Sequence, residues 1–277
     1  MFNNSNCKKI VNAALAIALT FSTFNLASKC QSIPDAQAIE FAKLAHERAQ
    51  AVWDQAEKEA KEKGITLTCK NCREVETIMG QYCPFNSDVP TIVDHKTFEE
   101  LKTNKIVLYR GFAAPSEELA NQWSLNTKIG IYKQGEEHNG LFCSIYKKQS
   151  DCPEGGSPLD MAAESYTDLD PHKRIISFFY DPEKARIGHG IYQIIEAYGE
   201  MCNYSKKVDN SRMALTDHEL ESLTDRDRFL YFITFGCSAA KFVSQLLGYD
   251  AIETHDWQYQ IFNTGILTFD EQDEIIE

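Results

Sequence analysis

Two short apolar strands that meet at a polar corner constrain the fold more than any other part of the sequence. Ala251 and Ile252 end the first expected strand, and residues 259–262 form the second, which breaks at Gly265 before apolar residues resume. Residues 253–258, between the strands, all carry hydrogen-bonding groups. Polar side chains at the ends of apolar strands are held by a rigid scaffold, so this corner is a candidate site. A solvated hairpin loop is the plain alternative.

Length and charge set the first limits on function. The chain has 277 residues, enough for one large domain or two small ones. Its 28 basic and 41 acidic residues give a net charge of −13. We therefore expect no nucleic-acid partner, because basic surface is needed to neutralise phosphates. A small anionic ligand held by one or two arginines is still compatible with that charge.

The first 28 residues have the pattern of an export signal. Lys8 and Lys9 precede the uncharged apolar run 10–26, and small residues suited to a signal peptidase follow. The run is short for a spanning helix, and the polar segment after it does not resemble a stop-transfer anchor. We expect a cleaved signal, a secreted or periplasmic protein, and no membrane span in the mature chain. An uncleaved anchor and lipidation at Cys30 are the alternatives.

The cysteines predict disulfides, because eight of the nine follow the signal and the expected compartment is oxidising. Cys69 and Cys72, with Cys83, are also compatible with part of a zinc site or with a redox pair. However, the sequence has no second CxxC to complete a zinc site and no thioredoxin-like context. We therefore expect structural disulfides, whose pairing the sequence leaves open, and no metal.

We expect a signal at 1–28, an N-terminal helix with a cysteine-rich connector at 29–95, and a main domain at 96–277. The helix spans 34–63, where apolar residues recur near helical spacing between Pro34 and Gly64. In the main domain we expect strands at 106–109, 140–144 and 174–180, helices at 98–101, 117–123, 159–166 and 225–247, and a frayed acidic tail from residue 270.

Arg110 and Gly111 directly follow the expected strand 106–109. An arginine at the end of a buried strand can reach into a pocket while the glycine lets the backbone turn away. Its planar guanidinium binds phosphate or carboxylate through two parallel hydrogen bonds. A strand-end arginine paired with a local acid is the alternative.

Taken in chain order, these pieces resemble the ADP-ribosyltransferase fold, specifically its bacterial and phage-associated toxin-like members. The pieces are Leu-Tyr-Arg110-Gly111, Gly-Leu-Phe142-Cys-Ser144, the helix with Tyr166, the motif GYDAI at 248–252 and the strand after it. The resemblance covers roughly residues 105–268. It implies an α+β fold with a split antiparallel β core of ADP-ribosyltransferase type, flanking helices and an N-terminal helix.

The resemblance also implies that the protein uses NAD as a substrate. Arg110 and Gly111 would hold the phosphate side. Phe142 and Ser144 would line the pocket for nicotinamide and ribose, and Tyr166 would stack on nicotinamide. Breaking the bond between nicotinamide and ribose leaves positive charge on the ribose, which a carboxylate stabilises.

The sequence departs from the family at the catalytic glutamate, where it has Gln258, with Gln260 two residues later. A glutamine orients a ribose hydroxyl but stabilises a cation poorly, and losing such a group costs orders of magnitude in rate. Glu253 and Asp256 are the nearby acids, and either replaces the carboxylate if the loop folds back toward the pocket.

We therefore expect a secreted toxin or effector that transfers ADP-ribose from NAD to an unknown protein acceptor, or cleaves NAD. Glu253, Asp256 and Gln258 are its candidate catalytic residues. One alternative is a catalytically inactive, exported binding protein on the same fold. Another is an unrelated secreted enzyme, although the sequence contains no G-x-S-x-G, HExxH or P-loop motif.

Overall fold

A computed structural model of the chain describes residues 32–85, 89–130, 140–147, 172–204, 206–208, 211–213, 215–236, 238–255 and 258–276. Several predictions lie outside these residues: the export signal, Asp256, and the helix at 159–166 with Tyr166. Within the described part, the fold is mixed α/β, with eight α-helices, an eight-stranded mixed sheet and a small two-stranded sheet. The prediction of a mixed fold is confirmed at this level, and the specific family type stays a prediction.

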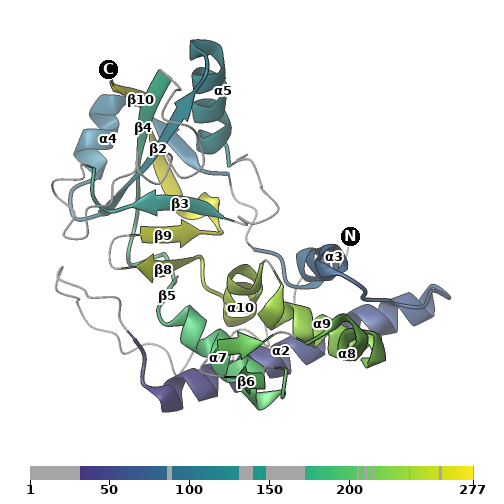
Figure 1. Ribbon diagram of the computed structural model, residues 1–277. Helices are drawn as coiled ribbons and strands as arrows, with labels where there is room; N and C mark the ends of the chain where they lie inside the picture. The colour runs from purple at the N-terminus through teal and green to yellow at the C-terminus, as the bar shows by residue number, and fades with distance from the viewer. Residues whose placement is uncertain are drawn as a thin grey trace.

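The elements are named as in Figure 1. The helices are α2 (Asp35–Glu62), α3 (Cys72–Tyr82), α4 (His95–Leu101), α5 (Glu117–Lys128), α7 (Ile191–Met201), α8 (Asp217–Ser222), α9 (Asp225–Phe235) and α10 (Ala239–Leu247). The strands are β1 (Thr91–Val93), β2 (Ile106–Ala114), β3 (Leu141–Ser144), β4 (His172–Tyr180), β5 (Ile187–Gly188), β6 (Lys206–Val208), β7 (Ser211–Met213), β8 (Ala251–His255), β9 (Gln258–Ile261) and β10 (Leu267–Ile276).

The large sheet has the strand order β1-β10-β4-β2-β3-β9-β8-β5. Its inner pairs are antiparallel, and the edge pairs β1–β10 and β5–β8 are parallel. A single residue pair, Tyr109 with Ser144, joins β2 to β3. In Figure 1 the long strands β10, β4 and β2 run across the direction of β3, β9 and β8, which lie below them. The sheet therefore consists of two halves that meet at one pair.

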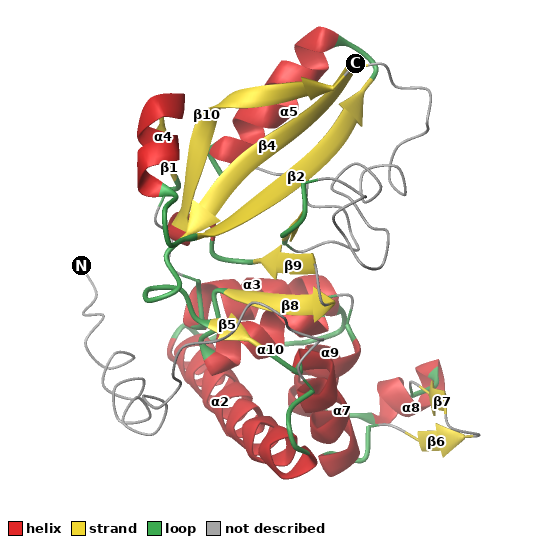
Figure 2. Cartoon of the chain, turned by 90° about the vertical axis from the view of Figure 1, so that its left-hand side faces the viewer, coloured by secondary structure: helices red, strands yellow, loops and turns green. Residues whose placement is uncertain are grey.

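One hydrophobic core lies on a single face of this sheet. Successive side chains of a strand point to opposite faces, so Leu108 of β2 and Phe178 of β4 share a face with Phe269 of β10. We call this face A, and its residues pack with α5. On the opposite face, face B, Phe98 of α4 contacts Phe179, with ring centroids 5.3 Å apart. Figure 2 shows α4 beside β10 and α5 along the long strands.

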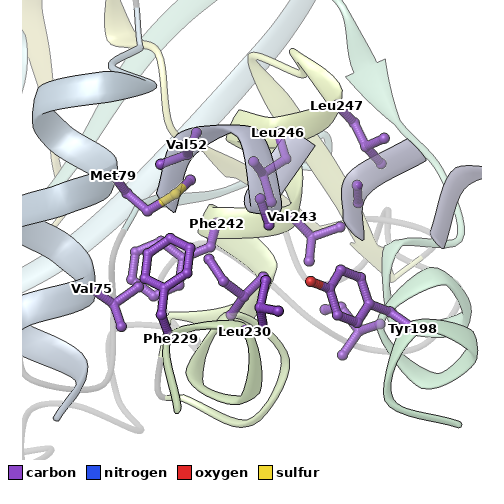
Figure 3. Packing of buried hydrophobic residues seen from close by; sticks show 14 of the residues in the cluster. Val52, Val75, Met79, Tyr198, Phe229, Leu230, Phe242, Val243, Leu246 and Leu247 are labelled. Carbon is purple, nitrogen blue, oxygen red and sulfur yellow. The ribbon is translucent and has the colours of Figure 1, made fainter. Parts of the chain in front are cut away.

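The second core lies among the helices below the sheet. Ala42, Ala45 and Ala49 line one side of α2 and are fully buried, so neighbouring helices approach that side closely. Trp53 packs on Phe229 of α9, with ring centroids 5.4 Å apart. Figure 3 shows this cluster, which includes residues of α3, α7, α9 and α10. The N-terminal helix therefore shares its core with helices from the second half of the chain.

The predicted end of the strand that begins at residue 106 is wrong. The strand does not stop before Arg110, because β2 pairs with β4 over its whole length, from Ile106 to Ala114. The predicted frayed tail is also wrong. Residues 267–276 form β10, which is hydrogen-bonded to β4 on one side and to β1 on the other. β1 pairs only with residues 268–270, and pairing with β4 holds Asp273 and Glu274 in the sheet.

The long helix predicted at 225–247 is broken. Gly236 ends α9 with a ψ of 163°, and α10 runs off at 101° to α9. Glycine is a poor helix former, so the chain turns there at low cost. Among the described residues, no single helix is long and apolar enough to cross a membrane, and only α9 and α10 together, as a bent pair, meet that test of length and composition.

Candidate functional site

The junction of the two sheet halves brings three predicted site residues close together in the backbone. Tyr109, next to Arg110, is paired with Ser144, and Ser144 is paired with Gln258 on the next strand. Neighbouring strands lie about 4.8 Å apart, so these backbone positions span about 10 Å. That distance is compatible with one pocket for a molecule of the size of NAD.

The side chains of Ser144 and Gln258 point to face B, where both have local partners. Ser144 is fully buried; its hydroxyl donates to the carbonyl of Tyr146 and accepts from the Tyr146 N–H, both at 3.0 Å. Oε1 of Gln258 accepts from the hydroxyl of Thr254 at 2.8 Å. Phe142 lies on the same face of β3, by the alternation of the strand. These contacts stabilise the end of β3 and the junction of β8 with β9.

Arg110 points to the opposite face, face A. It lies in the middle of β2, half-buried, and its Nη1 donates to the carbonyl oxygen of Phe142 at 3.2 Å. The bond ties one half of the sheet to the other. Gly111 is buried and paired with Ile175 of β4, so the backbone does not turn away at this glycine. The predicted strand-end pocket at Arg110 and Gly111 is therefore replaced by an arginine on the face of a continuous strand.

Glu253 also points to face A, from β8. It is only 4% exposed, and its Oε2 accepts a hydrogen bond from Nδ1 of His189 at 2.8 Å. Its Oε1 has no hydrogen-bond partner among the described residues. Leaving a buried acceptor unsatisfied costs about 1–3 kcal/mol, and more for a charged group, so such an atom calls for an explanation such as a ligand.

The sheet topology explains why His189 meets Glu253. β5 runs parallel to β8 with Gly188 paired to Ile252, so the next residue of each strand lies alongside the other. Gly190 then has a φ of +62°, a left-handed conformation that favours glycine, and α7 begins. The imidazole of His189 is 37% exposed, so the pair connects a buried carboxylate to the surface.

Two tyrosines accompany Glu253 on face A. Tyr259 of β9 is directly paired with Glu253, and Tyr180 ends β4; their hydroxyls are hydrogen-bonded to each other. Burial raises the pKa of both phenols, and Glu253 and Cys143 act in the same direction. Both hydroxyls are therefore protonated at neutral pH and act as hydrogen-bond donors.

The structure thus divides the predicted site residues between two faces. Arg110 and Glu253 share face A, whereas Ser144 and Gln258 lie on face B. His189 and the two tyrosines were missed by the sequence analysis. A local signal for His189 exists in the glycine that follows it, but its partner Glu253 is 64 residues away and is reached only through the parallel pairing of β5 with β8.

The described cysteines form neither a disulfide nor a metal cluster. No disulfide joins any two of Cys69, Cys72, Cys83, Cys143 and Cys202. No group of three or more His, Cys, Asp or Glu side chains in the described part of the chain is arranged to hold a metal ion. Burial raises the pKa of Cys69 to about 12, so its thiol stays protonated. The three other cysteines of the expected mature chain, Cys30, Cys152 and Cys237, lie outside the described residues.

Comparison of the chain with protein-family models, curated proteins and solved structures finds no match. A functional proposal for this protein therefore rests on the sequence resemblance and on the arrangement of side chains on face A.

Proposed function

We propose that the protein is an exported ADP-ribosyltransferase-like toxin or effector, which breaks the bond between nicotinamide and ribose in NAD and passes ADP-ribose to a protein or to water. One observation carries this proposal. Glu253 is a buried carboxylate with an unsatisfied oxygen, on the sheet face that also carries Arg110. Export is proposed from the pattern of residues 1–28.

In this proposal Glu253 supplies the carboxylate that Gln258 cannot. Its Oε1 is free to stabilise the positive charge that develops on the ribose. His189 binds the other oxygen, Oε2, and so fixes the orientation of the carboxylate. We therefore assign Glu253 as the catalytic residue and His189 as a positioning residue.

Arg110 supplies the positive charge that NAD requires on its phosphate side. Its bond to the carbonyl of Phe142 supports the guanidinium on face A. Tyr259 donates its proton to the hydroxyl of Tyr180, so the proton of Tyr180 is the one available to a hydroxyl or amide oxygen of the substrate. Asp256 and Tyr166 keep the roles that the resemblance implies for them.

A catalytically inactive binding protein on the same fold is the second candidate. One observation favours it: Gln258 occupies the family's glutamate position, and its amide oxygen is already bound to Thr254. In this candidate Arg110 binds the nucleotide and no bond is broken.

The test incubates the purified protein with labelled NAD and an extract of candidate host cells, and measures nicotinamide release and transfer of label. Glu253→Gln keeps the size of the side chain and removes its charge. We expect it to lower turnover by about 100-fold or more, the scale on which removing one stabilising group acts. Glu40→Gln, at an exposed position of α2, is the matched control and should leave turnover unchanged.

The outcomes separate the candidates. Wild-type turnover in Glu253→Gln would contradict the role of Glu253. No turnover in the wild type, with NAD still raising its melting temperature, favours the binding protein. A wild-type protein that shows no turnover and no binding of NAD would exclude both candidates.

A further inference from the structure

A pocket in the helical part of the molecule has no role in the proposed NAD chemistry. Its volume is about 330 Å³. Residues of α2, α7 and α9 and of the turn after α7 line it: His46, Gln50, Met201, Cys202, Tyr204, Arg226, Asp227 and Leu230. The set is mixed in chemistry, with a thiol, an imidazole and both signs of charge around one opening.

Cys202 and His46 form a thiol–imidazole pair in this pocket. Sγ of Cys202 lies 3.5 Å from Nδ1 of His46. The side-chain amide of Gln50 lies 2.9 Å from the other ring nitrogen, Nε2. Gln50 is one turn after His46 on α2, so the helix itself holds the amide against the ring.

The amide of Gln50 suits the tautomer that a base requires. The oxygen and nitrogen of such an amide are assigned from their hydrogen bonds, and either can face the ring. With the oxygen toward Nε2–H of His46, Nδ1 is left without a hydrogen and faces the thiol of Cys202. A thiol, an imidazole and an orienting third group, in that order, is the arrangement that activates a nucleophile.

Several groups keep this pair uncharged at rest. Burial, and then Arg226, lowers the pKa of His46, against an opposing effect of Glu47. Burial raises the pKa of the Cys202 thiol to about 11. In this tautomer the hydroxyl of Tyr198, which Figure 3 places in the helical core, donates to the same Nδ1 at 3.2 Å, so the hydroxyl and the thiol share one acceptor. The thiol is therefore not a preformed thiolate, and a base must take its proton as the sulfur attacks.

Access distinguishes Cys202 from Cys69 and Cys143, and its place in the pocket distinguishes it from Cys72 and Cys83, which are half-buried but do not line the pocket. Cys69 and Cys143 are fully buried, whereas Cys202 is half-buried and opens to the pocket. Arg226 lines the same opening with a partly exposed side chain, 3.3 Å from Asp54. Asp227 lines the same opening, so the pocket carries both signs of charge and does not select a ligand by charge.

We propose that Cys202 is a thiol-modification site for small disulfides, the class that includes glutathione disulfide. The sulfur of Cys202 attacks one sulfur of the ligand while Nδ1 of His46 takes the thiol proton. The ligand's S–S bond breaks, and the leaving thiolate takes the proton from His46. One S–S bond forms as another breaks, so the exchange needs no further oxidant or reductant.

The experiment exposes the folded, purified full chain to dithiobis(nitrobenzoate), an anionic disulfide, and to cystamine, a cationic one. Peptide mass spectrometry then follows labelling at Cys202. At neutral pH we expect Cys202 to react at least about tenfold faster than Cys69 and Cys143, because access controls thiol reactivity. Both reagents should label Cys202, because the opening carries both signs of charge.

The role of His46 has a readout of its own. His46→Gln should slow labelling of Cys202 by about tenfold or more, below the 100-fold scale of a fully optimised general base. It should also remove the rise in rate with pH that occurs below about 6.5 and leave only a rise that follows thiol ionisation. His218→Gln, at an exposed position of α8, is the matched control and should change neither quantity.

If His46→Gln fails to fold, as circular dichroism would show, Gln50→Leu serves instead and should slow labelling in the same direction. Three results would overturn the proposal. They are equal rates in wild type and in the folded His46 or Gln50 variant, no labelling of Cys202 in the folded protein, and Cys202 already bonded to another cysteine of the chain. Nicotinamide release from NAD is not a readout here, so failure of the proposed function does not affect this test.

Discussion

Phe269 tests most directly whether β10, the strand that leads into the acidic C-terminal segment, packs in the core of the sheet. It lies on β10, is fully buried on face A, and packs on Phe178 with ring centroids 4.8 Å apart. Ile275 lies on the same strand and is 64% exposed. Truncating each to alanine therefore compares a core position with a surface position on one strand.

The structure gives the size of the effect. Burying a phenylalanine side chain is worth about 1.5–3 kcal/mol. Its pairing with Phe178 adds about 0.5–1.5 kcal/mol. The sum of about 2–4.5 kcal/mol agrees with the usual cost of Phe→Ala in a core, about 3–5 kcal/mol once the cavity is included. Ile275→Ala should stay within about 0.5 kcal/mol, as at other exposed sites.

Urea unfolding followed by circular dichroism measures both changes. Phe269→Leu, which removes less volume, is the milder variant if the alanine protein does not fold, and it should fall between the wild type and Phe269→Ala. Equal, near-zero effects at Phe269 and Ile275 would refute the assignment of β10 to the core. A segment that frays in solution would give that result.

Two further predictions concern one ion pair and two glycines. His95 lies 2.6 Å from Asp270, whose carboxylate raises the pKa of His95, so the protonated imidazole stabilises the fold. That stabilisation is complete below the unfolded-state pKa of about 6.5 and is lost as the pH rises through the higher folded-state value. Over this pH range the urea midpoint of His95→Gln should therefore fall less than that of the wild type. Parallel plots of urea midpoint against pH for the two proteins would contradict the prediction. Gly248 has a φ of +76°, so Gly248→Ala should cost about 1–2 kcal/mol. Gly80→Ala, within α3 and with open space around an added Cβ, should instead stabilise the fold by about 0.5–1 kcal/mol. Thermal melting measures both variants, and shifts of the melting temperature in the same direction would be evidence against this reasoning.

The sequence predicted those helices and strands in which most residues favour the same secondary structure. Five of the seven residues at 174–180 are β-branched or aromatic, and they lie in β4. The helix predicted at 34–63 begins and ends within a residue of α2, since Pro34 and Gly64 mark its ends. The tail could not be predicted in this way. The sequence pattern predicts that Asp273 is exposed to solvent, but its Oδ1 lies 2.7 Å from Nζ of Lys128 of α5, and the two form an ion pair.

The candidate site was predicted in its neighbourhood and not in its geometry. The sequence pattern predicts one polar corner at residues 253–258, whereas β8 continues to His255 and a bulge separates the pairing of Glu253 from that of His255. A shift of one residue sends a side chain to the other face of a sheet. Register therefore decides whether Glu253 faces Arg110 or Gln258, and register is fixed by pairing with strands far away in the sequence.

The shared core of the helices has a consequence for biosynthesis. The alanine-lined side of α2 is buried against helices that begin at Ile191, about 130 residues after α2 ends. At about 5–20 residues per second, a ribosome needs roughly 6–26 s to make that interval. During that time α2 has α3 beside it but lacks α7, α9 and α10, so its alanine-lined side stays open to solvent until those helices are made.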